Sequence, residues 1–481
     1  MIHDATVARD GHRCRMKLPA AAHMRLLSFS LLLLPSLLLA AETLSLQECR
    51  QLALENNEGL RAAEMHMQAA EQKRKAAVTQ YLPAFDFTGS YTRQSDIPTY
   101  STPALNIPIT DVSAGAASSQ YRLIVPPQDL EFGTEDVYLL SVGIRQPVFT
   151  GGKIRNNHKM RVHLENIAKE KRRLKAEDVI YETDENYWLV VSMRERVRLA
   201  EQYKQMVGEH VETLSNMLEA GIVMDNDLLK AKVKFNETEW LLLEAQDGVQ
   251  LSQMVLCRVI GLPLDTQVTP SDRLEDEPVA VADASSAESA LKQRPEIRML
   301  EDNVNVGRSV EAIKRSRYAP QIALWADYLY MNPSPYNSFE DEFDDVWMVS
   351  VVCSLDLFHW NERGFELGAA RRERQAAELN LEEARKGVAL EVKQAKFQVD
   401  EALKKIRLTT SSLAQAEENL RVTRDRFSEG VVKSTDVLDA QVLWQESYSK
   451  HIDAKSEYRL KVSARQKALG ILLETEKGNE R

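Results

Sequence analysis

Two aspartates three residues apart are the side chains in this sequence best suited to chemistry. Asp436 and Asp439 follow Gly430, which is predicted to end one long helix. They lie in the next helical segment, so their carboxylates share one helix face. Several copies of such a pair around a narrow opening would form a carboxylate ring that selects cations. The alternative is that Asp436 only caps the helix and Asp439 is a solvated surface charge.

No other constellation of residues predicts catalysis. The nine histidines show no metal-ligand spacing, and neither an HExxH nor a CxxC motif occurs. The run Gly151-Gly152-Lys153 lacks the upstream glycine and the following Ser or Thr of a phosphate-binding P-loop, so it predicts a turn from strand to helix. We therefore expect no enzymatic activity, no cofactor and no metal site.

The segment that carries the aspartates occurs twice along the chain. Gly221 with Asp227 recurs 209 residues later as Gly430 with Asp436, each within a similar run of apolar residues. A repeat at this spacing indicates a duplicated subdomain. Asp439 has no counterpart, because Lys230 stands at the matching position of the first copy, so the two tips are not equivalent.

Alternating apolar and polar residues predict two strands in each half, at about 84–92, 138–148, 321–330 and 346–357. Tyr81-Leu82-Pro83 recurs 237 residues later, so the first half carries 28 extra residues (237 minus 209), and residues 93–136 are predicted to be a loop. Strands of this length with one apolar face suit an outer-membrane barrel or a small soluble β-domain. Four strands cannot close a barrel in lipid, so a membrane barrel would need several chains; three would supply twelve strands.

Long helices make up most of the remaining sequence. Residues 46–80 are predicted to be one helix, and Gly364–Phe427 would form a helix of roughly 95 Å. Gly221 and Gly430 end the ascending helices, and Asp227 and Asp436 are predicted N-caps of the returning helices. Each half thus contains an αα-hairpin. A coiled-coil seam spaced by four and three residues runs through Ala395, Val399, Ala402, Ile406, Thr409, Leu413, Ala416, Leu420, Thr423 and Phe427.

The N-terminus has the pattern of an export signal. Arg25 precedes an apolar run, Leu26–Leu39, and two alanines follow, so the mature chain is expected to begin near Glu42. No later uncharged run of about 18 apolar residues could span a bilayer as a helix. The net charge of −11 makes nucleic acid an unsuitable partner.

Over residues 43–474 this arrangement resembles the TolC-like outer-membrane efflux proteins. Each matching motif is short, but their order, doubling and spacing make the resemblance specific. The motifs are Leu46-Gln47-Glu48 with Ala53-Leu54, Gln80-Tyr81-Leu82-Pro83, Gln146-Pro147-Val148-Phe149-Thr150-Gly151-Gly152-Lys153, Glu219-Ala220-Gly221 with Asp227-Leu228-Leu229, and Phe427-Ser428-Glu429-Gly430 with Thr435-Asp436-Val437-Leu438-Asp439-Ala440-Gln441.

The resemblance implies a mainly α fold with membrane β-structure. A duplicated unit of long coiled-coil helices and four strands would assemble as a homotrimer, with a shared β-barrel in outer-membrane lipid and an α-helical barrel in the periplasm. The parts would be a leader (1–41), a first repeat (42–270), a linker in an equatorial belt (271–290) and a second repeat (291–481). The implied function is the passive outer-membrane channel of a tripartite efflux or secretion system, joined to an inner-membrane pump by a periplasmic adaptor.

The resemblance also suggests roles for residues at the tips. It places Asp436 and Asp439 at a pore constriction near the periplasmic end. Phe427 stands where some relatives carry a tyrosine whose hydroxyl helps to hold the tip closed. The competing class is a periplasmic coiled-coil adaptor or scaffold, which two hairpins and four strands per chain disfavour. The positions expected at the tips and in adaptor contact are Gly221, Asp227, Lys230, Gly430 and Val431.

Overall fold

The structure is a computed structural model that describes residues 42–97, 99–110, 120–131, 134–274, 287–336 and 341–473. The predicted leader lies outside the described residues, as does part of the predicted linker. The elements in chain order are β1 (Glu42–Leu44), α1 (Leu46–Asn56), α2 (Glu58–Thr79), β2 (Ala84–Arg93), β3 (Thr99–Ser101), β4 (Leu105–Thr110), β5 (Gln120–Val125), β6 (Asp129–Glu131), β7 (Asp136–Phe149), α3 (Lys153–Glu219), α4 (Asp225–Ile260), β8 (Val268–Pro270), α5 (Ala287–Gln293), α6 (Pro295–Ser316), β9 (Gln321–Asn332), β10 (Asp344–Ser354), α7 (Glu362–Ser428) and α8 (Ser434–Leu469).

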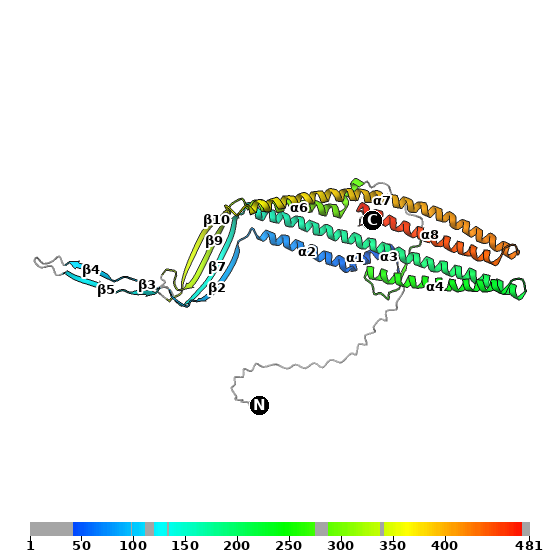
Figure 1. Cartoon of the computed structure of the whole chain (residues 1–481), viewed down its shortest axis with the longest axis horizontal. Helices are drawn as coiled ribbons and strands as arrows, with labels where there is room; N and C mark the ends of the chain where they lie inside the picture. The colour runs from blue at the N-terminus through cyan, green and yellow to red at the C-terminus, as the bar shows by residue number, and fades with distance from the viewer. Residues whose placement is uncertain are drawn as a thin grey trace, which may run out of the picture. The chain divides into compact units, whose positions relative to one another are not determined.

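Two hairpins of matching length form the larger part of the helical region (Figure 1). Helices α3 and α7 each contain 67 residues, about 100 Å, and α4 and α8 each contain 36. Helix α3 packs along α4, α7 packs along α8, and α3 also packs against α8. No described helix has an apolar stretch long enough to cross a membrane. The predicted seam residues that are buried are Ala395, Val399, Ala402, Ala416, Leu420 and Phe427.

The largest hydrophobic core lies where α1, α3, α4, α7 and α8 meet, and includes Tyr187, Leu256 and Trp444. Beside it, β1 pairs in parallel with β8. The single helix predicted over residues 46–80 is wrong. Asn57 is extended and its side-chain oxygen accepts the N–H of Leu60 at 3.0 Å, so α1 ends and α2 begins there.

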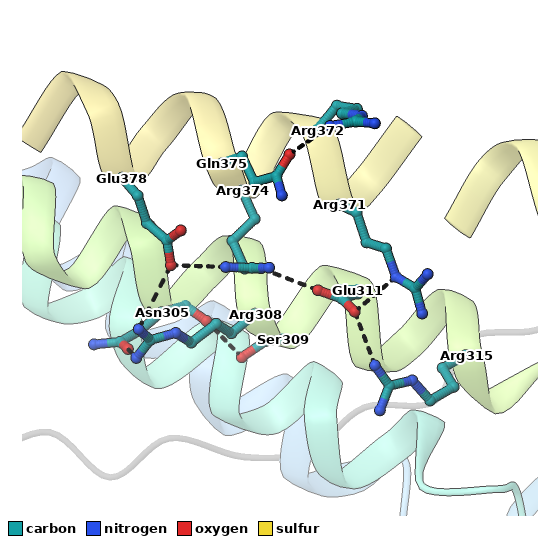
Figure 2. Close-up of polar contacts among 10 residues, drawn as sticks. All are labelled: Asn305, Arg308, Ser309, Glu311, Arg315, Arg371, Arg372, Arg374, Gln375 and Glu378. Atoms are coloured by element: carbon teal, nitrogen blue, oxygen red, sulfur yellow. Dashed lines mark hydrogen bonds and ion pairs between the residues drawn. The ribbon is translucent and has the colours of Figure 1, made fainter. Parts of the chain in front are cut away.

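At the ends nearest the sheet, α3 and α7 are flanked by α2 and α6 instead of α4 and α8. Gly307 permits close approach of α6 to α7, because a Cβ there would lie 3.3 Å from Cβ of Arg374. One turn further, Glu311 accepts hydrogen bonds from Arg315 (2.8 Å), Arg371 (3.2 Å) and Arg374 (3.0 Å) (Figure 2). Burial alone would raise the pKa of Glu311, but these guanidinium groups lower it below its usual value.

The four predicted strands form one antiparallel sheet in the order β10-β9-β7-β2. One cross-strand row contains Phe87, Val142, Tyr328 and Trp347. All four side chains are exposed, as are most of their apolar neighbours on this face. The alternation predicted from the sequence therefore gives one continuous apolar face.

The opposite face of the sheet is polar. Arg145 Nη1 lies 2.6 Å from Asp327 Oδ1, Arg145 Nη2 lies 4.0 Å from Asp86 Oδ2, and the guanidinium lies 4.5 Å from the ring centre of Trp325. Gly143 leaves room for this arrangement, since a Cβ there would lie 2.7 Å from Asp86 Oδ2. The cluster puts charged groups on the face opposite the apolar one.

The loop predicted over residues 93–136 is also wrong, because much of it forms a two-stranded β-ribbon. β3 pairs with β6 and β4 pairs with β5, both antiparallel. Leu105 lies opposite Val125 and Ile107 lies opposite Leu123, so one face of the ribbon is apolar. The high content of Pro, Ser and Thr concealed this alternation.

Candidate functional site

The two hairpin tips share one turn geometry. Gly221 and Gly430 are the second residues after α3 and α7, with φ of 71° and 76°. The N–H of Ile222 donates to the carbonyl of Met217 at 2.8 Å, and the N–H of Val431 donates to the carbonyl of Arg426 at 2.9 Å. This is a Schellman turn, whose left-handed residue favours glycine.

Asp227 and Asp436 are not the predicted N-caps. Helix α4 begins at Asp225 and α8 begins at Ser434, so each aspartate is the third residue of its helix. Asp436 Oδ2 accepts the N–H of Lys433 at 3.0 Å. The carboxylate therefore stabilises the start of α8 by bonding back to the residue before the helix, at the positive end of the helix dipole.

Asp436 and Asp439 are both exposed and lie on one face of α8. Lys230 is exposed on α4 and, within the described residues, makes no ion pair. Val431 is also exposed, whereas Asp227 is half-buried. In the described part of the chain, no three His, Cys, Asp or Glu side chains gather closely enough to hold a metal ion.

A buried contact joins the two hairpins near their tips. His210 of α3 lies with Nε2 2.9 Å from Ser434 Oγ of α8, and its ring packs edge-on against Phe427. Burial, assisted by the nearby charge of Arg424, lowers the pKa of His210 to about 4, so the ring is neutral at pH 7. Apolar side chains around it are Leu214, Leu228, Ala231 and Val437.

Sequence reasoning missed His210, because its partner Ser434 lies 224 residues away and neither residue belongs to a motif. It did single out Phe427, the position where some relatives carry tyrosine. The buried Phe427 ring packs within the contact between the hairpins. The polar bond in this contact comes instead from His210 and Ser434.

Comparison with known proteins gives the same architecture. The sequence model of the outer membrane efflux protein family matches residues 49–262 and 287–470. Alkaline protease secretion protein AprF of Pseudomonas aeruginosa is 21% identical over 421 residues, covering 87% of this chain and 82% of AprF. Proteases secretion protein PrtF of Dickeya chrysanthemi is 21% identical over 413 residues, covering 84% of this chain and 83% of PrtF.

The crystal structure of the Campylobacter jejuni CmeC outer membrane channel superimposes with a TM-score of 0.73 at 16% identity, over 90% of this chain and 89% of CmeC. At this identity the superposition shows the fold alone. The family match covers both halves of the duplicated chain, and this protein therefore belongs to the outer membrane efflux protein family.

Proposed function

We propose that three copies of this outer membrane efflux protein assemble into a passive export duct. The observation that carries the proposal is the four-stranded sheet, whose edge strands β10 and β2 each pair with only one described strand. Bare strand edges are costly in lipid, while the exposed apolar face suits it. Three sheets joined edge to edge would give a closed barrel of twelve strands.

The long helices supply a second argument for neighbouring copies. The apolar side chains of Leu379, Leu390, Phe397 and Leu408 on α7 are between 57% and 71% exposed. Their spacing by 11 or 7 residues keeps them on one side of the helix. Such a row of exposed apolar residues favours packing against a helix of another copy.

In this assembly the helices extend into the periplasm, and the tips meet a periplasmic adaptor that links the duct to an inner-membrane pump. We assign adaptor contact to Gly221, Asp227, Lys230, Gly430 and Val431, because the tips are where the helices end. The chain itself needs no catalytic group or cofactor for this role, since the pump supplies the energy.

The assembly is tested by locating the protein. We expect the mature chain to migrate as an SDS-resistant trimer in outer-membrane fractions and to dissociate on heating. Recovery of a soluble periplasmic monomer would refute the proposal and favour a coiled-coil scaffold.

We further propose that Asp436 and Asp439 ring the periplasmic opening. The Asp436→Ala/Asp439→Ala variant removes two carboxylates per chain, so cation preference in planar bilayers is expected to fall and block by multivalent cations to weaken. The fold is expected to survive, because the loss of the Asp436 carboxylate at the start of α8 costs about 0.3–1 kcal/mol.

The matched control is Asp225→Ala/Asp227→Ala, which removes the same charge from the first hairpin. It is expected to leave cation preference unchanged. If the Asp436→Ala/Asp439→Ala trimer keeps the wild-type selectivity, the two aspartates only stabilise and solvate α8.

A further inference from the structure

The sheet meets the long helices at two corners. In the first corner β7 leads into α3, and in the second β10 leads into α7. The duplication relates the two corners, but they differ in charge. In the second corner, Arg317 follows α6, and its Nη1 lies 2.5 Å from Glu366 Oε2 and 3.6 Å from Glu362 Oε1 of α7. Lys314 Nζ lies 3.4 Å from Glu366 Oε1. In the second corner, Lys314 and Arg317 thus each pair with carboxylates of the same chain.

The first corner has lost those carboxylates. The shift of 237 residues relates Arg317 to Gln80, and the shift of 209 relates Glu362 and Glu366 to Lys153 and Asn157. Asn157 donates to Gln80 Oε1 at 2.9 Å, in the place of the ion pair between Arg317 and Glu366.

A second cation appears two turns further along α3, where Arg161 replaces the buried Ala370 of the second corner. The exchange of Glu362 for Lys153 and of Ala370 for Arg161 makes the first corner cationic. Both cations belong to helix α3, which begins at Lys153.

These groups surround a cavity of about 450 Å³. None of its lining residues is acidic, and among the described residues neither Lys153 nor Arg161 makes an ion pair. The arginines around Glu311 (Figure 2) show the opposite pattern, since they share carboxylates of α6 and α7. Ile154 and Ile313 add apolar surface to the cavity, and its polar lining consists of Gln80, Thr150, Lys153, Asn157, Arg161 and Gln321.

We propose that this cavity binds a phosphate group. A guanidinium offers paired N–H donors to two phosphate oxygens, and an ammonium group supplies a compact positive charge. The hydroxyl of Thr150 and the side-chain amides of Gln80 and Gln321 add further hydrogen-bonding groups. The bound anion neutralises Lys153 and Arg161, as Glu362 and Glu366 neutralise the cations Lys314 and Arg317 in the second corner.

Two sources supply this chemistry, a phospholipid headgroup and free phosphate. The cavity lies where β7 and β9 meet α3 and α6, so the headgroup source rests on the proposed placement of the sheet in the membrane. There the strands end at the periplasmic surface of the bilayer, where lipid phosphates are concentrated. Binding of free phosphate does not depend on that placement.

The test uses the full-length protein purified in detergent. Native mass spectrometry measures retention of phosphatidylglycerol against phosphatidylcholine, and calorimetry measures binding of inorganic phosphate. The wild-type protein is expected to retain phosphatidylglycerol preferentially, and added phosphate is expected to displace it. The Lys153→Gln/Arg161→Gln variant is expected to bind at least about tenfold more weakly, because charge-assisted hydrogen bonds are lost.

The matched control is Arg155→Gln/Lys159→Gln, which removes the same charge from α3 at positions that do not line the cavity. It is expected to bind as the wild type does. Equal loss in both variants would assign the effect to general surface charge and overturn the proposal. A wild-type protein that binds neither phosphatidylglycerol nor phosphate would overturn it as well.

A third variant guards against misfolding of the first. Gln80→Arg/Lys153→Glu/Asn157→Glu installs the ion pairs of the second corner, so it is expected to fold and to lose phosphate binding. Retained binding in this variant would contradict the proposal. Binding of phosphate without phosphatidylglycerol would identify the free anion as the source.

Conductance of the wild type in planar bilayers separates this test from that of the duct. A protein that binds phosphate but does not conduct would refute the duct alone. A conducting protein without phosphate binding would refute the cavity assignment alone.

Discussion

Replacing Arg50 by methionine is expected to destabilise the protein by about 3–5 kcal/mol, because it leaves a buried carboxylate without its partner. Arg50 of α1 bonds Asp184 of α3 twice, with Nε and Nη2 each 2.6 Å from a carboxylate oxygen. Asp184 is fully buried. Unfolding by guanidinium chloride, followed by circular dichroism on the purified assembly, measures the change in free energy.

Two further variants define the cause of the loss. Arg196 of α3 pairs with Asp453, whose side chain is 57% exposed, so Arg196→Met is expected to cost less than about 1 kcal/mol. Combining Arg50→Met with Asp184→Leu removes both charges and is expected to recover much of the stability. A double variant as unstable as Arg50→Met would show that lost packing, rather than the unpaired carboxylate, causes the effect.

Replacing Val351 by arginine is expected to destabilise the membrane-inserted protein by about 2–4 kcal/mol if the site lies near the bilayer midplane. Val351 lies opposite Leu324 on the apolar face of the sheet and is 71% exposed. A charge there would face hydrocarbon in the proposed barrel. Urea unfolding in lipid vesicles, with the yield of folded protein in outer-membrane fractions, measures the effect.

Ser350 provides the control for this substitution. It is the chain neighbour of Val351, at nearly the same depth, but lies opposite Trp325 on the polar face. Ser350→Arg is therefore expected to cost much less. Equal losses at the two positions would mean that the apolar face does not contact lipid.

The repeating parts of this fold were predictable because their signals are local. Alternation along the strands set both faces of the sheet, and the register keeps Phe87, Val142 and Tyr328 in one row. The glycines at 221 and 430 marked the tips, because the turn needs a left-handed residue after the helix. The ribbon of β3, β4, β5 and β6 escaped prediction because its strands are short and β4 contains Pro108.

Contacts between segments far apart in the chain were not predictable. The pair of Arg50 with Asp184 spans 134 residues, and neither side chain differs in type from dozens of surface charges. The predicted starts of α4 and α8 were misplaced because their N-cap positions are the extended residues Met224 and Lys433, whose side chains make no capping hydrogen bond. In the sequence, the first corner was visible only as the turn at Gly151-Gly152-Lys153. Its positive charge became informative only when the two corners were compared in the structure.

The β-ribbon makes the connection between the two strands of the first half much longer than the one in the second half. Residues 94–135 connect β2 to β7, whereas only residues 333–343 connect β9 to β10. Both connections lie at the end of the sheet farthest from the helices. In the proposed duct, this end faces the outside of the cell. Antibodies and bacteriophages would therefore meet mainly the first half of the chain. Sequence change in the ribbon can alter what the cell displays without touching the hairpins that export depends on.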